Sequence, residues 1–127
     1  QRNENRKGHG DTEAGKEYLL TFDMSGNPAG GDSIKTLQVS VTGAVTPATF
    51  NYYMTSANKL NNMLWDEMTY YFTATSASTT LTFSSLEFNA YGPALDNVNV
   101  SLVPLPATIL LGFLGLGIGG WRLRKSL

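Results

Sequence analysis

The 127-residue sequence contains no cysteine, which excludes a disulfide framework, a thiolate zinc site and a thiol nucleophile. It contains a single histidine, His9, so no histidine cluster is available to bind a metal ion. The adjacent acids Asp66 and Glu67 would point to opposite faces of a strand, which is a poor arrangement for paired acid–base catalysis. No serine nucleophile elbow and no phosphate-binding glycine loop is present. The sequence therefore predicts a protein that is not an enzyme.

Acidic residues are absent after Asp96, whereas basic residues return at the very end of the chain. Residues 1–104 hold six lysines and arginines against ten acids, a net charge of −4, and the last six residues carry three basic side chains. A negatively charged domain without a basic patch interleaved with aromatic residues repels the phosphates of nucleic acids. The charge pattern therefore excludes nucleic acid as a partner.

A helical period is absent between Glu17 and Val103, and apolar residues recur at every second position instead. This alternation is typical of strands that bury one face, and turn-forming stretches such as SGNPAGGDS at residues 25–33 separate the runs. We predict a mainly β protein built as an antiparallel β-sandwich. The expected inward-facing residues are Tyr18, Leu20, Phe22 and Met24; Leu37, Val39 and Val41; Phe50, Tyr52 and Met54; Met68, Tyr70, Phe72 and Ala74; Leu81 and Phe83, followed after a bulge by Leu86 and Phe88; and Asp96, Val98, Val100 and Leu102.

The composition divides the chain into three regions. We predict a loose polar arm over residues 1–13, the β-sandwich over residues 14–103 and a C-terminal tail over residues 104–127. A sandwich of about ninety residues has a marginal core. We therefore expect further strands ahead of this chain in the whole protein.

The tail holds a long uncharged run, the 19 residues from Val103 to Trp121. As a helix this run spans about 28 Å, close to the thickness of the hydrocarbon core of a bilayer. It is followed by Arg122, Arg124 and Lys125, and such a basic end stays on the cytoplasmic side of a membrane. We predict a single-pass transmembrane helix over residues 107–121, with the sandwich in the periplasm or outside the cell. The G-x-x-x-G pair at positions 115 and 119 either lets two helices associate or makes the helix easy to unwind for a processing enzyme.

The stretch VPLPATILLGFLGLGIGGWRLRK, residues 103–125, resembles the PEP-CTERM sorting signal of Gram-negative bacteria. The motif residues are Val103, Pro104, Leu105 and Pro106, and Leu105 stands where the signal usually has glutamate. The resemblance implies a membrane-bound exosortase as the processing partner. The letters LPATI, residues 105–109, also resemble the sortase signal of Gram-positive bacteria, although Ile109 replaces its glycine.

Three further stretches, AGKEYLLTFDMSGNP, YYFTATSASTTLTFSS and AYGPALDNVNVSLVP, resemble the choice-of-anchor C family. The resemblance covers residues 14–104, and GPALDNV is its most specific part. It implies a galactose-binding-like jelly roll in exported bacterial proteins, which often end in PEP-CTERM tails.

Oxygen-bearing side chains lie near the ends of two predicted strands. Asp23 and Asn27 could join Asp96 and Asn97 in a calcium site if these segments meet at one end of the sandwich, because calcium takes several carboxylate and amide oxygens. The alternative is that Asp96 caps a turn through backbone amides.

Aromatic residues out of phase with the predicted core are free to stack against sugars. Tyr53 and Tyr71 fall on the face opposite to the core residues, and Trp65 precedes a strand. We predict that these three form a glycan-stacking platform, the alternative being that they are ordinary core or surface residues.

The sequence as a whole predicts an exported protein of the cell envelope or extracellular matrix, anchored or sorted through its C-terminus and afterwards kept at the surface or released. Its sandwich would bind or embed in exopolysaccharide without catalysis. The alternative is a structural surface protein that associates with itself through β-edges or the glycine-lined helix.

Overall fold

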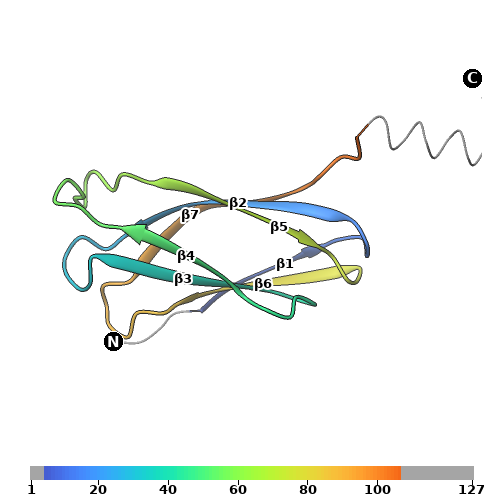
Figure 1. Ribbon diagram of the computed structural model, residues 1–127, viewed down its shortest axis with the longest axis horizontal. Coiled ribbons are helices and arrows are strands. Elements are labelled where there is room, and N and C mark those ends of the chain that lie inside the picture. The colour runs from blue at the N-terminus through green and yellow to red at the C-terminus, as the bar shows by residue number, and fades with distance from the viewer. Residues whose placement is uncertain (1–4, 107–127) are drawn as a thin grey trace, which may run out of the picture.

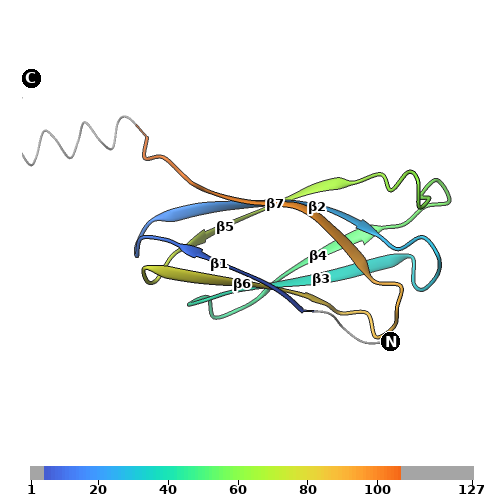
Figure 2. The ribbon, with the colours of Figure 1, turned by 180° about the vertical axis from the view of Figure 1, so that it is seen from behind.

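The computed structural model describes residues 5–106, with the backbone alone for Asn5, Arg6, Lys7 and His9. These residues form a sandwich of two antiparallel sheets (Figures 1 and 2). The mainly β fold predicted from the alternation is confirmed. The strands are β1 Asn5–Asp11, β2 Glu17–Gly26, β3 Ile34–Val41, β4 Ala48–Tyr53, β5 Asp66–Thr73, β6 Ser78–Ser85 and β7 Pro93–Leu102.

Strands that are distant in the sequence pair with one another. One sheet has the order β1-β6-β3-β4 and the other the order β5-β2-β7, with antiparallel neighbours throughout. Within these sheets only β3 and β4 are both consecutive in sequence and hydrogen-bonded neighbours. Most strand pairs therefore join segments far apart in the chain, and the hydrophobic face of each strand has to specify its register.

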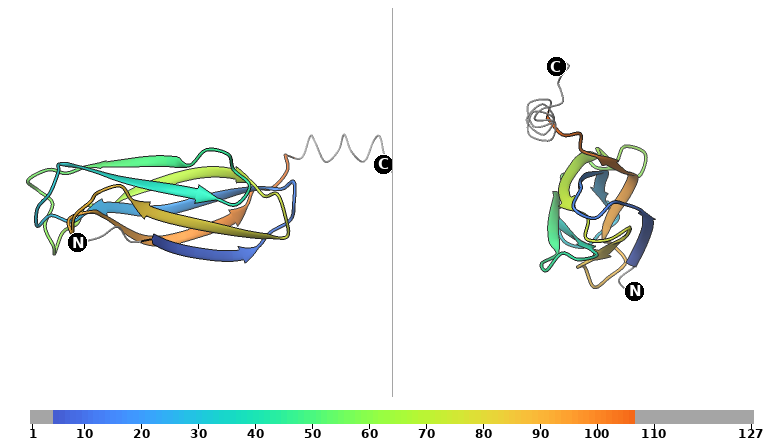
Figure 3. Two further views of the ribbon diagram at one scale, coloured as in Figure 1. Left: turned by 90° about the horizontal axis from the view of Figure 1, so that it is seen from below. Right: turned by 90° about the vertical axis from the view of Figure 1, so that its right-hand side faces the viewer.

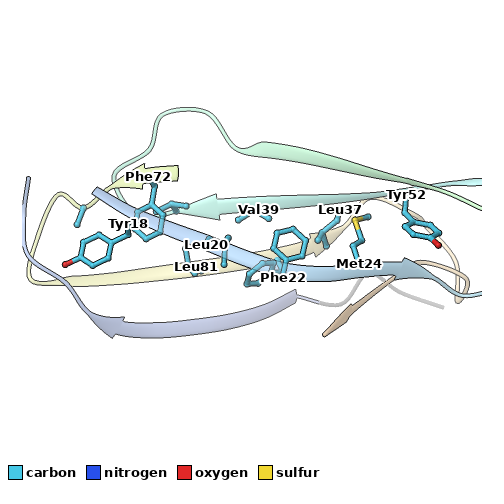
Figure 4. Packing of buried hydrophobic residues seen from close by; sticks show 12 residues of the cluster. Tyr18, Leu20, Phe22, Met24, Leu37, Val39, Tyr52, Phe72 and Leu81 are labelled. Atoms are coloured by element: carbon cyan, nitrogen blue, oxygen red, sulfur yellow. The ribbon is translucent and has the colours of Figure 1, made fainter. Parts of the chain in front are cut away.

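The core lies between the two sheets and is centred on β2 (Figure 4). Tyr18, Leu20, Phe22 and Met24 all point inward from this strand and are buried. Phe22 is 1% exposed, and its ring meets those of Phe50 and Phe83 edge-on at centroid distances of 5.2 and 5.7 Å. Burial of alternate apolar side chains drives the pairing of the sheets.

Residues Asn5–Asp11 form an edge strand, so the prediction of a loose arm over residues 1–13 is wrong for this segment. β1 pairs with β6 over its whole length, from Asn5 opposite Ser84 to Asp11 opposite Ser78. Its inward-facing positions opposite Leu81 and Thr79 carry glycines, Gly8 and Gly10, so no apolar alternation marks the strand. Backbone hydrogen bonds to β6, rather than side-chain burial, hold it in the sheet.

The predicted bulge in β6 is absent, because this strand ends at Ser85 and Phe88 lies exposed in the following loop. The irregularity lies in β7 instead, where the register against β2 shifts between Thr21 and Asp23. Asn97 takes a left-handed conformation there, with a φ of 54°. The extra residue reverses the phase of the strand, so Asp96 faces outward and does not share the inner face with Val98 as predicted.

A hollow of about 330 Å³ opens between β1 and β7, because four strands face only three. Gly8 and Gly10 leave it wide on one side, and Val98 and Val100 line the other. The expectation of strands ahead of this chain stays a prediction.

In the described part of the chain, residues 5–106, no helix is long and apolar enough to cross a membrane. The predicted transmembrane segment 107–121 and the basic residues Arg122, Arg124 and Lys125 lie outside the described residues.

Replacing Phe22 with alanine is expected to destabilise the domain by about 3–5 kcal/mol, since it removes a fully buried ring and leaves a cavity. Val45→Ala is the matched control, because Val45 is 98% exposed and should change stability by less than about 0.5 kcal/mol. Urea denaturation followed by tryptophan fluorescence measures both. Equal stabilities of the two variants would contradict the position given to β2 in the core.

Candidate functional site

Three long connections meet at one end of the sandwich, which we call the loop end (Figures 1 and 3). They are the loops at residues 27–33, 54–65 and 86–92, which join β2 to β3, β4 to β5 and β6 to β7. The other end has shorter turns, and the chain leaves the sandwich there after β7 (Figure 1). Many of the exposed large apolar side chains also belong to or adjoin these loops: Ile34, Tyr53, Leu60, Leu64, Trp65, Leu86, Phe88 and Tyr91.

A buried polar network holds the long 54–65 loop in shape. The Asn58 amide donates to the Tyr52 hydroxyl at 2.9 Å and to the carbonyl of Met63 at 2.7 Å, while its oxygen accepts from the Thr55 amide at 2.8 Å. Tyr52 in turn donates to the carbonyl of Leu64, and Ser25 Oγ to that of Met63 at 2.6 Å. Since Asn58 and Ser25 are buried, these bonds satisfy groups that water cannot reach.

The 27–33 loop is fixed against the 86–92 loop and by the side chain of Lys35 from β3. Asn27 accepts from the Ala29 amide at 2.9 Å and donates through its side chain to the carbonyl of Ala90 at 3.3 Å. Lys35 Nζ donates to the carbonyl of Gly30 at 2.8 Å from beneath the loop. Gly31 has a φ of +81°, a left-handed conformation that favours glycine.

A pocket of about 480 Å³ lies between the first two of these loops. Its size falls in the range of small-ligand sites. The side chains of Asp32, Ser33, Ser56 and Lys59 line it and form no hydrogen bond or ion pair with any other described residue. The rest of its wall is Asn27, Pro28, Gly30, Gly31, Met54, Thr55 and Asn58. The pocket therefore offers unused hydroxyl and charged groups on ordered loops.

The three aromatic residues of the predicted glycan platform lie apart. Tyr53 is 64% exposed on the outer face of the four-stranded sheet, whereas Tyr71 is 57% exposed on the outer face of the other sheet, beside Leu19. Trp65 lies at the loop end, directly ahead of β5. Tyr53 and Tyr71 therefore do not belong to one binding surface.

The structure brings together half of the predicted calcium ligands. Asp23 and Asp96 are cross-strand partners on the outer face of the three-stranded sheet, and Glu67 lies opposite Asp23 on its other side. The Asn27 side chain forms hydrogen bonds with the backbone of Ala29 and Ala90. The backbone N–H of Asn97 donates to Asp96 Oδ1 at 2.8 Å. Among residues 5–106 no group of three or more histidine, cysteine, aspartate or glutamate side chains is placed to hold a metal ion.

The predicted sorting motif directly follows β7. The Val103 amide donates to the carbonyl of Glu17 at 2.9 Å, so the sheet ends here. Pro104, Leu105 and Pro106 are exposed. This stretch is therefore accessible to another protein.

The sequence did not single out the pocket residues Asp32, Ser33, Ser56 and Lys59. They lie in two loops 21 or more residues apart in the chain, and no spacing rule connects them. One signal was present: Lys35 is in phase with Leu37, Val39 and Val41, which places a charged side chain on the inner face of β3 next to this loop.

The fold resembles carbohydrate-binding modules. The chain superimposes on a structure described as "CBM4 structure and function" (TM-score 0.56, 17% identity, 78% of this chain and 61% of that one). It also matches "EclA C-terminal domain; sugar-binding protein" (0.58, 15%, 76% and 65%) and a family 35 carbohydrate binding module from Clostridium thermocellum (0.55, 15%, 76% and 68%). The chain thus spans less than two thirds of the first two structures. These likenesses define the class of fold, a mainly β antiparallel sandwich.

The chain belongs to the DUF642 family, described as "Protein of unknown function", whose sequence pattern matches residues 9–101. No curated protein matches the sequence.

Replacing Asn58 with alanine is expected to destabilise the domain by about 1–3 kcal/mol, because buried partners lose their hydrogen bonds. The 54–65 loop should also become sensitive to limited proteolysis. Asn62→Ala in the same loop is the matched control, since the Asn62 side chain is exposed and has no partner among the described residues. If both variants resist protease equally, the network does not order the loop.

Proposed function

We propose that the protein is a non-catalytic saccharide-binding module and that the loop-end pocket is its binding site. The pocket's unpartnered polar side chains are the observation that carries the proposal. Serine hydroxyls, a carboxylate and an ammonium group match the donors and acceptors that sugar hydroxyls present. The resemblance of the fold to that of known carbohydrate-binding modules supports the same assignment.

The pocket is equipped for binding rather than for hydrolysis. Among its lining residues Asp32 is the sole carboxylate, whereas glycoside hydrolysis uses a pair of carboxylates across the scissile bond. Met54 and Pro28 add apolar surface on which the C–H face of a sugar ring can rest. This combination of a few polar groups with apolar support orients a ligand without activating it.

We further propose that the whole protein is exported. Its sandwich would be a choice-of-anchor C domain with a jelly-roll topology, and its tail would be a PEP-CTERM signal. The exposed segment at Pro104–Pro106 supports access by an exosortase-type enzyme. Residues 103–106 leave the sandwich opposite to the loop end (Figure 1), so a domain anchored through its C-terminus would direct its pocket away from the membrane. Exopolysaccharide outside the cell is then the proposed partner.

Binding is tested on a glycan array with the full chain in detergent. We expect retention on at least one saccharide, and Ser33→Trp should weaken it by roughly tenfold or more, because a bulky ring in the pocket displaces its hydrogen bonds. Val45→Trp is the matched control at the opposite end of the sandwich and should bind normally. Equal losses in both variants, or no retention on any saccharide, would refute the proposed site.

Sorting is tested by the intact mass of the protein recovered from its native cell envelope. We expect a product that ends near Pro104–Pro106, because this segment is exposed and precedes the signal-like tail. An uncut mass would show that Leu105, in place of glutamate, prevents processing and that the tail stays as an anchor.

A further inference from the structure

A charged side chain lies buried at the floor of the loop end. Lys35 is 0% exposed, and its stem lies beside Gly26, which Met54 also approaches, at the end of the core. Nζ donates one hydrogen bond, to the carbonyl of Gly30 at 2.8 Å. Among the described residues it has no other hydrogen bond and no ion pair. Two of the three N–H groups of a buried ammonium are therefore left without an acceptor.

The loop above Lys35 also presents unused backbone donors. The backbone N–H groups of Gly30, Gly31 and Asp32 form no hydrogen bond within the described structure, and all three residues line the pocket. A Cβ built on Gly31 would lie 2.7 Å from Tyr91 Cβ and 2.8 Å from Lys35 Nζ, so the glycine allows the ammonium to lie directly against the loop backbone. Successive free amides in a tight loop form a concavity that attracts anions.

An unpaired buried charge is costly, and the cost falls when an opposite charge comes close. Lys59 adds a second cation at the wall of the same pocket. The loop amides on the pocket wall therefore suit oxygen acceptors with negative charge, and Lys35, which does not itself line the pocket, adds positive charge beneath them.

We propose that the pocket is selective for acidic saccharides, with the ligand's carboxylate over Gly30 and Gly31 and within the field of Lys35. This inference rests on the proposed function and names its substrate class. Lys35 acts from beneath the loop as a positioning and charge-providing residue, because it is fully buried. Asp32 opposes the effect, since its exposed carboxylate lies in the same pocket.

The test compares methyl glucuronide with methyl glucoside, which differ by a carboxylate in place of a hydroxymethyl group. Both are titrated into the full chain in detergent micelles, and the amide resonances of residues 30–33 are followed by NMR. We expect the glucuronide to bind about tenfold more tightly or better, the size of a charge-assisted hydrogen bond. Lys35→Met should weaken the glucuronide far more than the glucoside and so abolish this preference, and Asp32→Asn should strengthen it.

A merely structural lysine would behave differently. Lys35→Met would then lower the melting temperature and weaken both sugars alike, which would overturn the inference. If Lys35 instead provides charge to the pocket, the melting temperature of Lys35→Met does not fall, because the substitution removes an unpaired buried charge. If Lys35→Met does not fold, Asp32→Asn at its exposed position still decides the matter, because an unchanged preference for the glucuronide in that variant would contradict the inference.

Three further outcomes are decisive. Equal binding of both sugars would refute acidic selectivity and leave the proposed function intact. Binding of neither sugar at the pocket amides would refute the site itself. Sodium sulfate is titrated at the same concentration as a third ligand. If it shifts the same amide resonances as strongly as the glucuronide does, the pocket is a general anion site and its selectivity for saccharides is refuted.

Discussion

Burial of the inward face of β2 sets the arrangement of both sheets. β2 is the central strand of the three-stranded sheet, and its four alternate side chains contact the opposite sheet along its whole length (Figure 4). A shift of one residue would turn Phe22 and its neighbours to solvent, so this face fixes the register of both β5 and β7. Because the sheets are thereby locked, the three loops at one end start and finish at fixed points.

The loop end shows a division between groups that order the site and groups that remain available. Asn58 and Tyr52 use their hydrogen bonds inside the domain, and Asn27 ties two loops together. The side chains of Ser33 and Ser56 form no hydrogen bond with the described chain. A rigid shell around unused polar groups reduces the entropy lost when a ligand is ordered, which is how a small pocket can bind without large conformational change. Lys35 is the exception, since a buried ammonium with one acceptor lowers stability.

Much of the fold could be predicted from the sequence, because β2 to β6 bury alternate apolar residues and turn residues separate them. β1 could not, since Gly8 and Gly10 carry no hydrophobic signal and the strand depends on its partner β6. The bulge at Asn97 was also missed, and it moved Asp96 from the inner to the outer face. The pocket could not be predicted, because two loops that no sequence rule connects form it, and exposed aromatic residues such as Tyr71 favoured a site on the sheet faces instead.

The proposed function places the saccharide at the loop end and not on a sheet face or in the hollow beside β7. Hydrogen–deuterium exchange of the full chain, with and without a saccharide that it retains, locates the binding site. We expect slower exchange in residues 27–33 and 54–59, with β7 and the outer sheet faces unchanged. Slower exchange confined to β1 and β7, or to the strand that carries Tyr71, would contradict it and place the site elsewhere.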